Sequence, residues 1–581
     1  MTKNKLFKYL SIGVVLIIFI TNNSCTKLNT EPYSAVTPEQ FLTTRDAVIA
    51  DFLRCFGHGF WTEQGTQFQV QENTTDELMT CNRLGNWLNG GYGERLHYHT
   101  WTILDVGDAV WQNLYQGASL ATNSLQDMES IDNPAKLQQL NVSATELADF
   151  EAELRTMRAW FHLRALDFFR NIVLVKEVKD STMTGTQVTP QAASDFIESE
   201  LLAAIPNLPT RESIGANWIG RWTQAAAAVL LARLYLNSQV YTGVDRYADC
   251  ANICQDIING KYGTYQLATN WSDPFDYTNG SLSSETIFGF PSTLNGSHWH
   301  YTNDMYWWMM SYQVPSYLGF SDWGSSNDEY ALQPGRDVDS VEYSFTLGKP
   351  YVKFQRYPDD YRLQLYKNLG NSKRQGMFLF GYLPYINSNG EPDTVRDGQS
   401  TRTPLFFRDQ VGMFLATPPG VPIADKESDM NHADFASGIL PIKYPFYPTS
   451  DANRITSAYA EIRYSEVYYM LAECKYRAGD KAGAALLLNA VRQRNYPANS
   501  PSLYKADGSQ LTDQEMLDEW GREFLVEGRR RTDLIRWGVF NTGTWWDKQP
   551  DADNHTAILP LGQTTLELSP QLKQNPGYPA Q

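Results

Sequence analysis

The chain has 581 residues, of which 42% are hydrophobic and 13% aromatic, and its 48 Lys and Arg against 65 Asp and Glu give a formal net charge of −17. This composition supplies ample apolar surface for a folded core and excludes a disordered chain. The acidic balance disfavours a nucleic-acid-binding protein, because polyanions are held mainly by clustered Lys and Arg. A mean hydropathy of −0.42 excludes a protein with many membrane spans.

Residues 1–24 have the features of a secretory signal. Three Lys precede an apolar run, and small and polar residues lead to Cys25. The run is too short to span a bilayer comfortably and fits the hydrophobic region of a signal peptide. Ser24 before Cys25 resembles a bacterial lipobox, although Asn22 departs from the Leu that this pattern prefers. We predict a lipoprotein signal peptide over 1–24, lipidation at Cys25 and a polar tether over 25–36; the alternative is an ordinary secreted protein.

The remaining cysteines do not indicate a disulfide-built scaffold, because they are few and odd in number. They are Cys55, Cys81, Cys250, Cys254 and Cys474. Cys250 and Cys254 share one helical face, and we predict both to be small core residues.

Helical periodicity dominates the two ends of the chain. Thr37-Pro38 and Thr189-Pro190 are typical helix starts, with Thr as the N-cap and Pro at the first helical position. A 3.6-residue period predicts helices over 106–127, 146–169, 222–237, 246–259, 456–478 and 481–494. Many are consecutive pairs with small and large residues placed as in tetratricopeptide units. We therefore predict a mainly α fold of degenerate tetratricopeptide-like helical repeats, with about four helix pairs at 37–127, 146–205, 222–259 and 456–494.

A long segment of different composition separates the third and fourth pairs. Residues 271–455 are rich in Gly, Pro, Asn, Ser and aromatics and lack a sustained helical period. This pattern predicts a large irregular insertion of loops and short strands. Because long irregular segments within compact proteins are usually functional, we expect the ligand face here, between an N-terminal helical region at 37–270 and a C-terminal one at 456–581.

Several motifs in order along the chain carry a family resemblance. They are Trp111-Gln112-Asn113-Leu114-Tyr115 with Asn123, the Arg-rich helix from Glu153 to Phe169 with the strand Ile172–Val175, Ala225–Asn237, Arg463–Ala472, Arg522–Leu525, Glu527–Arg530, Asp533–Arg536, and Gln574–Tyr578. Together they resemble the SusD/RagB family, which consists of surface lipoproteins that partner TonB-dependent transporters in nutrient uptake by certain Gram-negative bacteria. The resemblance covers nearly the whole mature chain.

The resemblance implies a protein that binds an oligosaccharide or polysaccharide and delivers it to a SusC-like TonB-dependent transporter. It implies a lipid anchor in the outer membrane, on the side that faces the cell exterior, and neither enzymatic activity nor a cofactor. The C-terminal charged residues agree, because no activated nucleophile or matched acid and base accompanies them. We predict structural ion pairs at helical spacing among Glu523, Glu527, Arg530, Arg531 and Asp533.

Aromatic side chains mark the candidate glycan site. Sugars present apolar C–H faces and a rim of hydroxyls, so flat rings flanked by polar groups bind them. Segment 296–330 is dense in Trp and Tyr, and the resemblance implies glycan-stacking aromatics there and in an earlier loop, here 84–101, which also holds Trp101. The candidate residues are Trp87, Asn89, Tyr92, Trp299, Tyr301, Trp307, Trp308 and Trp323. For any single ring, packing in the core is the alternative.

Other chemistries have weaker signals. His97-Tyr98-His99 and His298-Trp299-His300 could chelate a metal from strands, but no carboxylate or cysteine accompanies either pair at ligand spacing, so we predict hydrogen-bonding histidines and no metal. Paired carboxylates of a secreted helical glycoside hydrolase cannot be recognised from spacing alone. Binding of peptides in the same kind of transporter complex is the main alternative ligand class.

Overall fold

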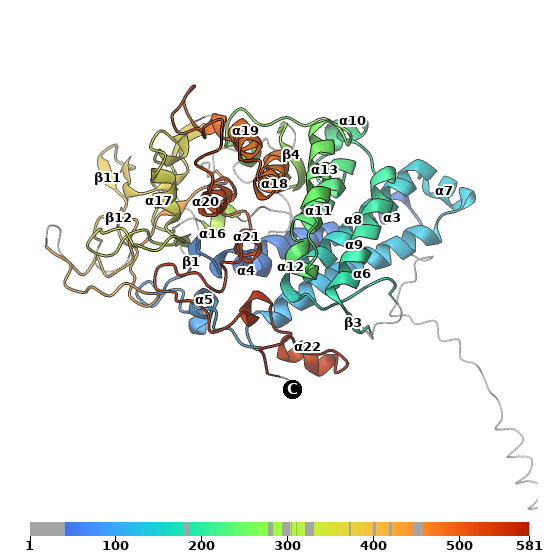
Figure 1. Ribbon diagram of the computed structural model, residues 1–581, viewed down its shortest axis with the longest axis horizontal. Coiled ribbons are helices and arrows are strands. Elements are labelled where there is room, and N and C mark those ends of the chain that lie inside the picture. Colours follow the sequence, from blue (N-terminus) through green and yellow to red (C-terminus); the bar gives the residue numbers. More distant parts are fainter. Residues whose placement is uncertain are drawn as a thin grey trace, which may run out of the picture.

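Figure 1 shows the computed structural model of the chain. It describes residues 41–579 apart from 179–184, 277–282, 293–302, 304, 310, 320–329, 371–372, 399–401, 418–420 and 446–456. The predicted signal peptide, lipidation site and tether lie outside the described residues. Among the described residues, no helix is both long and apolar enough to cross a membrane.

Stacked helix pairs form the scaffold. The successive helices are α3 (Arg45–Thr62), α6 (Gly107–Ser130), α8 (Ala144–Phe169), α9 (Pro190–Ala204), α11 (Gln224–Leu236), α13 (Tyr247–Ile258), α18 (Tyr464–Arg477) and α19 (Lys481–Arg492). Each packs against the next in this order. In Figure 1 the stack begins with α3, α6 and α8 on the right and reaches α18 and α19 near the top. The predicted mainly α fold of degenerate tetratricopeptide-like helix pairs is confirmed.

Local sequence explains where these helices start and how closely they approach. The Thr189 side chain accepts a hydrogen bond from the Ala192 backbone N–H, so the predicted Thr-Pro start of α9 is confirmed. Gly117 in α6 lies against α8, where an added Cβ would stand 2.1 Å from the Phe161 ring. A glycine is therefore required at this crossing for the two helices to pack.

The predicted helix start at Thr37-Pro38 lies outside the described residues. Phe41 is helical and 44% exposed, and the next helix, α3, begins at Arg45 with Thr44 as its N-cap. Another predicted helix begins later than expected. The predicted helix over 456–478 is preceded by strand β14 (Tyr459–Arg463), which pairs with β4 (Thr286–Phe290) from the insertion. Helical periodicity could not reveal this strand, because its partner is about 170 residues away in the chain.

The insertion consists of loops, short strands and single helical turns, as predicted. Its elements are β4, α16 (Met305–Trp308), β5 (Ala331–Leu332), α17 (Pro350–Gln355), β6 (Lys367–Gly370), β7 (Lys373–Gln375), β8 (Phe378–Leu379), β9 (Gly381–Tyr382), β10 (Pro384–Ile386), β11 (Pro392–Thr394), β12 (Phe406–Phe407) and β13 (Leu440–Pro441). Every paired strand belongs to a two-stranded antiparallel sheet. Much of the insertion, in yellow, lies to the left of the helix stack in Figure 1.

Shorter elements complete the chain. They are α4 (Phe68–Asn73), β1 (Leu78–Met79), α5 (Tyr92–His97), α7 (Pro134–Leu140), β2 (Ile172–Val173), β3 (Gln187–Val188), α10 (Arg211–Ile214), α12 (Ser238–Thr242), α20 (Asp513–Phe524), α21 (Arg530–Arg536) and α22 (Gln563–Leu568). The five cysteines after Cys25 are buried thiols that form no disulfide with one another. Cys250 and Cys254 are therefore core residues, as predicted.

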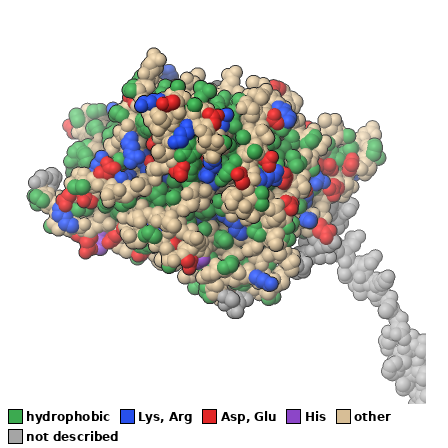
Figure 2. All heavy atoms as spheres, viewed as in Figure 1, with side chains coloured by type: hydrophobic (Ala, Val, Ile, Leu, Met, Phe, Trp, Pro, Cys, Tyr) green, Lys and Arg blue, Asp and Glu red, His purple; other side chains and the backbone are tan. Residues whose placement is uncertain are grey.

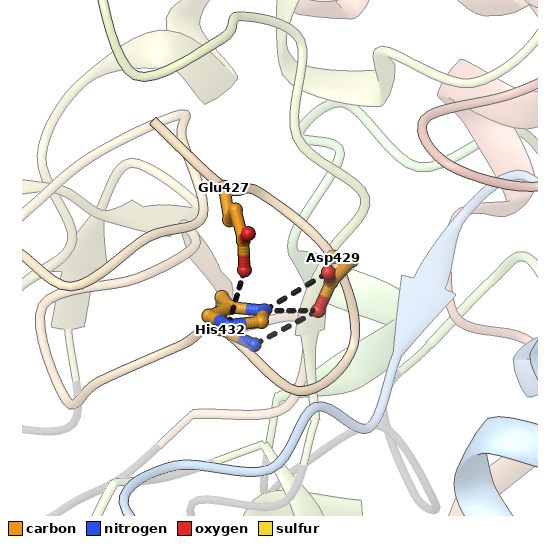
Figure 3. Close-up of side chains that lie close together, drawn as sticks. All are labelled: Glu427, Asp429 and His432. Atoms are coloured by element: carbon orange, nitrogen blue, oxygen red, sulfur yellow. Dashed lines mark hydrogen bonds and ion pairs between the residues drawn. The ribbon is translucent and has the colours of Figure 1, made fainter. Parts of the chain in front are cut away.

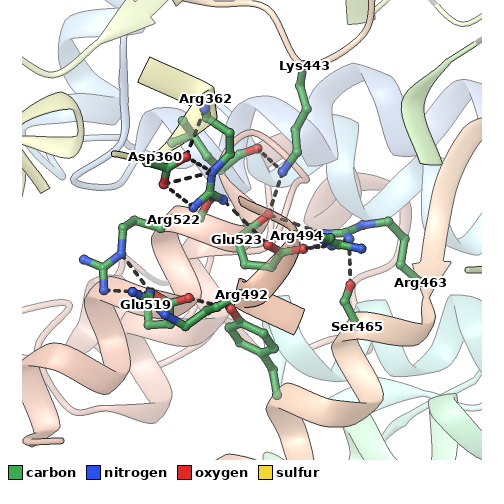
Figure 4. A network of polar contacts seen from close by, with 12 residues as sticks. Asp360, Arg362, Lys443, Arg463, Ser465, Arg492, Arg494, Glu519, Arg522 and Glu523 are labelled. Carbon is green, nitrogen blue, oxygen red and sulfur yellow. Dashed lines mark hydrogen bonds and ion pairs between the residues drawn. The ribbon is translucent and has the colours of Figure 1, made fainter. Parts of the chain in front are cut away.

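A buried ion-pair network joins the C-terminal region to the insertion (Figure 4). The Arg463 guanidinium lies 2.8 Å from Glu285, 3.0 Å from Glu523 and 2.8 Å from Glu527. Arg494 pairs with Glu285 and, at 2.5 Å, with Glu523. All five side chains are buried or nearly so. Burial raises the pKa of Glu523, but Arg494 and Arg463 lower it to about 2, so the carboxylate stays charged.

The predicted structural ion pairing of the C-terminal charges is confirmed, but most pairs are not helical. α20 ends at Phe524 and α21 begins at Arg530, because the intervening backbone is extended at Leu525 and left-handed at Val526 and Gly528. Glu523 and Glu527 therefore pair with residues distant in sequence. So does Arg530, whose Nε lies 2.6 Å from Asp76. The expected spacing holds for Asp533, which pairs with Arg536 at 2.8 Å. Arg531 donates to the backbone carbonyl oxygen of Ala557.

Candidate functional site

The start of one segment predicted to hold the ligand and the end of the other adjoin two paired strands. β1 and β5 pair antiparallel, with Leu78 opposite Leu332 and Met79 opposite Ala331. Loop 84–101 follows β1, and segment 296–330 ends directly before β5. Segments more than 200 residues apart in the chain therefore leave the scaffold from one small sheet.

Loop 84–91 has an unusual backbone. Six of its residues have positive φ: Leu84 (54°), Gly85 (96°), Trp87 (64°), Asn89 (42°), Gly90 (60°) and Gly91 (77°). Left-handed backbone is uncommon for residues other than glycine, and such conformations gather at binding sites where the surroundings enforce them. Trp87 and Asn89, both candidate residues, are among the non-glycine residues in this conformation.

Two buried or half-buried arginines hold the loop in place. At its start, Nη1 of the buried Arg83 donates to the backbone carbonyl oxygens of Asp434 (3.0 Å) and Ser437 (2.7 Å). At its end, Arg95 donates from Nη1 to the Gly90 carbonyl oxygen (2.7 Å) and from Nε to Asp105 (2.9 Å). Charge-assisted hydrogen bonds of this kind are stronger than neutral ones. The loop is therefore fixed at both ends before any ligand arrives.

The loop presents a mixed apolar and polar surface. Asn89 is exposed, and Trp87 and Tyr92 are half-buried. Leu84 and Leu88, which sequence reasoning did not single out, are 51% and 49% exposed. The turn-forming Gly and Asn residues around these two leucines were the sequence pattern that could have indicated their exposure. Trp101 belongs to the core instead, since it is 4% exposed and its indole N–H donates to the Tyr578 hydroxyl.

Only part of the aromatic segment is described. Trp308 on α16 is half-buried, and its ring centroid lies 5.8 Å from that of the buried Tyr330. Trp299, Tyr301 and Trp323 lie outside the described residues, as does the side chain of Trp307. The meeting of Trp87 with rings of segment 296–330 on one open face stays a prediction.

The first histidine pair forms hydrogen bonds within the protein. His97 Nε2 lies 2.5 Å from Asp547, whereas His99 contacts Asp551 through Nδ1 (2.7 Å) and the Thr74 carbonyl oxygen through Nε2 (2.8 Å). Burial lowers the pKa of His99 to about 4, and the hydrogen bond to Asp551 acts against this shift. These contacts confirm the hydrogen-bonding role predicted for the pair, and the second pair lies outside the described residues.

A different cluster has the atoms of a metal site (Figure 3). Within the described ranges, it is the only group of three or more His, Cys, Asp and Glu whose ligand atoms lie within 4.8 Å of one another. His432 Nε2 is 2.5 Å from Glu427, and Nδ1 is 2.9 Å from Asp429. The hydrogen bond that the His432 ring donates to Asp429 is the main cause of the raised pKa of His432. Because each ring nitrogen faces a carboxylate, the arrangement favours a protonated imidazole, and a metal would have to displace that proton.

The surface shown in Figure 2 has no large field of one sign. Lys and Arg side chains lie beside Asp and Glu over much of this face. A surface with both signs interspersed creates no strong net field that would steer a strongly charged partner to this face.

Fold and sequence together define a protein of stacked helix pairs that carries a loop-rich insertion. The model of the SusD family matches residues 422–578. The starch-binding protein SusD of Bacteroides thetaiotaomicron is 25% identical over 441 residues, which cover 74% of this chain and 72% of that protein. These matches support the SusD/RagB resemblance that the sequence motifs indicated.

Solved structures show the same fold. A surface glycan-binding protein A from Bacteroides uniformis matches with a TM-score of 0.61 and 16% identity, covering 92% of this chain and 99% of that one. A laminarin-binding SusD-like protein matches with a TM-score of 0.59 and 18% identity, covering 92% of this chain and 100% of that one.

Proposed function

We propose that the protein binds oligosaccharide or polysaccharide at the cell surface and passes it to a SusC-like TonB-dependent transporter, without cleaving it. The likeness to a protein named as starch-binding supports this ligand class. The surface glycan-binding protein and the laminarin-binding protein, which have the same fold, agree with it. The observation that carries the proposal is loop 84–91, which has a left-handed backbone and exposed apolar side chains.

The chemistry of the site follows from the residues on this loop. Trp87 and Tyr92 supply ring faces for the C–H surface of a sugar, while the Asn89 amide donates to and accepts from hydroxyls. Rings from segment 296–330 complete the platform in this proposal: Trp299, Tyr301, Trp307, Trp308 and Trp323. Several weak contacts of this kind give modest affinity, which suits a ligand that must later be released.

The other parts of the chain have supporting roles in this proposal. Residues 1–24 direct export, and Cys25 anchors the protein by lipid to the outer membrane. The helical repeats within 37–270 and 456–581 supply a rigid scaffold and much of the contact with the transporter. The absence of catalysis is supported by the C-terminal carboxylates Glu523 and Glu527, because both side chains are buried and paired with Arg463.

Affinity electrophoresis in gels that contain starch, laminarin or other polysaccharides tests the proposal. We expect retardation of the native protein by at least one glycan and its loss in Trp87→Ala. The control Leu568→Ala removes a 76% exposed apolar side chain on α22, far along the chain from the loop, and should be retarded normally. Binding of peptides in place of glycans would support the alternative ligand, and release of reducing sugar would contradict the non-enzymatic account.

A further inference from the structure

A second open groove lies among the helix ends of the repeat scaffold. It has a cavity volume of about 540 Å³, within the usual range for ligand sites. Its walls come from the ends of α13, α18, α19, α20 and α21, none of which belongs to loop 84–101 or segment 296–330. The residues that matter for its chemistry are Asp245, Tyr247, Tyr476, Arg477, Asp513 and Trp537. We call it the helix-end groove.

Aromatic rings in the groove are fixed in place. The Arg477 guanidinium carbon lies 4.9 Å from the Tyr247 ring centroid and 4.2 Å from that of Trp537. Arg477 Nε in turn donates to Glu473 at 2.9 Å. The ring of Tyr476 lies 6.2 Å from that of Trp537. Cation–π contacts to Arg477, which is itself held by the buried Glu473 carboxylate, thus fix three half-buried rings along one side of the groove. A ligand that binds there does not lose free energy to ordering these rings.

The cations of the groove are already engaged, whereas its carboxylates keep free acceptors. Arg536 pairs with Glu473 at 2.9 Å, and Lys481 donates to the Leu511 carbonyl oxygen at 2.8 Å. In Asp245, Oδ1 accepts from the Tyr247 backbone N–H (2.8 Å). In the same way, Oδ1 of Asp513 accepts from the Tyr476 hydroxyl (2.7 Å). The Oδ2 atom of each exposed aspartate accepts no hydrogen bond from the described residues, so two acceptors stand beside the rings.

We propose that the helix-end groove is a second carbohydrate site, which takes a short neutral glycan segment. Sugar C–H faces stack on Tyr247 and Trp537, and hydroxyls donate to Asp245 and Asp513. An anionic sugar would have to compete with Glu473 for the groove's arginines. A peptide is disfavoured, because helical walls offer no open strand edge for an extended chain and the charged lining offers no apolar stripe for a helix.

The inference rests on the proposed function and extends it to long ligands. A polysaccharide that reaches both the loop site and the helix-end groove would be bound at two points, so its apparent affinity exceeds that of a short oligosaccharide at either.

The test uses the full protein with ¹⁵N-labelled tryptophan, titrated with maltooligosaccharides and laminarioligosaccharides. The indole N–H signal of Trp537 is identified by its loss in Trp537→Phe. We expect this signal to shift in the native protein and in Trp87→Ala, but not in Asp513→Asn. Tyr247→Phe, which keeps the ring, should retain the shift, and Tyr247→Ala should weaken binding at this site about tenfold or more.

Stoichiometry separates this inference from the proposed function. Native mass spectrometry should find two oligosaccharides on the native protein and one on either Trp87→Ala or Asp513→Asn. The protein could instead bind a single sugar, and this binding could be lost in Trp87→Ala but unchanged in Asp513→Asn. That result would refute sugar binding in the helix-end groove and would leave the proposed function standing. A Trp537 shift caused by peptides but not by sugars would also overturn it, and binding of no sugar at either place would contradict both.

Discussion

Replacing Arg463 should be among the most destabilising single changes in the C-terminal region. Arg463 is buried and contacts Glu285, Glu523 and Glu527 within 3.0 Å, so Arg463→Ala leaves three carboxylates short of a counter-charge. Removal of one partner from a buried ion pair typically costs about 3–5 kcal/mol. The pKa of Glu523 gives a similar scale. Burial raises that pKa, but Arg494 and then Arg463 lower it from 4.5 to about 2, which corresponds to about 3 kcal/mol of stability at neutral pH.

Urea unfolding of matched variants measures this effect. Arg45→Ala is the control, because Arg45 also forms an ion pair with a glutamate, Glu146, but with side chains that are 37% and 29% exposed. We expect Arg463→Ala to lower the free energy of unfolding by about 3–5 kcal/mol and Arg45→Ala to lower it by about 1 kcal/mol or less. Equal effects of the two substitutions would refute the reasoning that burial makes the network costly to break.

The same network should contribute to acid sensitivity. The folded-state pKa of Glu523 is lower than its unfolded value, so its contribution to stability is present above about pH 4.5 and is lost as the pH falls towards 2. In Glu523→Gln, which cannot titrate, the decline of stability between these pH values should be shallower. An unchanged slope would mean that Glu523 does not carry this contribution.

Three further predictions concern single contacts. By NMR titration, the pKa of His432 should fall in Asp429→Asn, because the hydrogen bond that His432 donates to the Asp429 carboxylate is the main cause of its raised pKa; an unchanged midpoint would contradict the bridged geometry. Gly117→Ala should lower the free energy of unfolding by about 1–3 kcal/mol through overpacking, because the added Cβ would stand 2.1 Å from the Phe161 ring; an unchanged urea midpoint would contradict this close approach. Thr189→Ala should cost about 1 kcal/mol by removing the N-cap of α9, and an unchanged melting temperature would argue against that cap.

The helix pairs could be predicted from the sequence because their signals are local. Periodic apolar positions and caps such as Thr189 lie within a few residues of the helix they specify. Strand β14 was assigned to a helix, because its partner β4 belongs to the insertion and its pairing is a tertiary contact. The ion pairs were expected within one helix, because sequence spacing indicates only local partners. Arg530 instead pairs with Asp76, which is distant in the sequence.

The candidate site could be predicted by composition but not by shape. Density of aromatic residues pointed to two segments, yet it could not separate Trp101, which packs in the core, from Trp87, which lies on the loop. Nor could it reveal the exposed Leu84 and Leu88, because exposure depends on the left-handed backbone of loop 84–91. The hydrogen bonds from Arg83 to the backbone of Asp434 and Ser437 join distant parts of the chain. No local sequence pattern could therefore have predicted them.

The most direct test of the central claim is a calorimetric binding isotherm of a soluble oligosaccharide. The oligosaccharide is a fragment of the polysaccharide that retards the native protein. The isotherm is measured on the native, Trp87→Phe and Trp87→Ala proteins, after their thermal stabilities have been shown to be equal. If the ring on the left-handed loop stacks against sugar, Trp87→Phe should keep most of the affinity, and Trp87→Ala should lose the binding at that site. Identical isotherms for all three proteins would contradict the account.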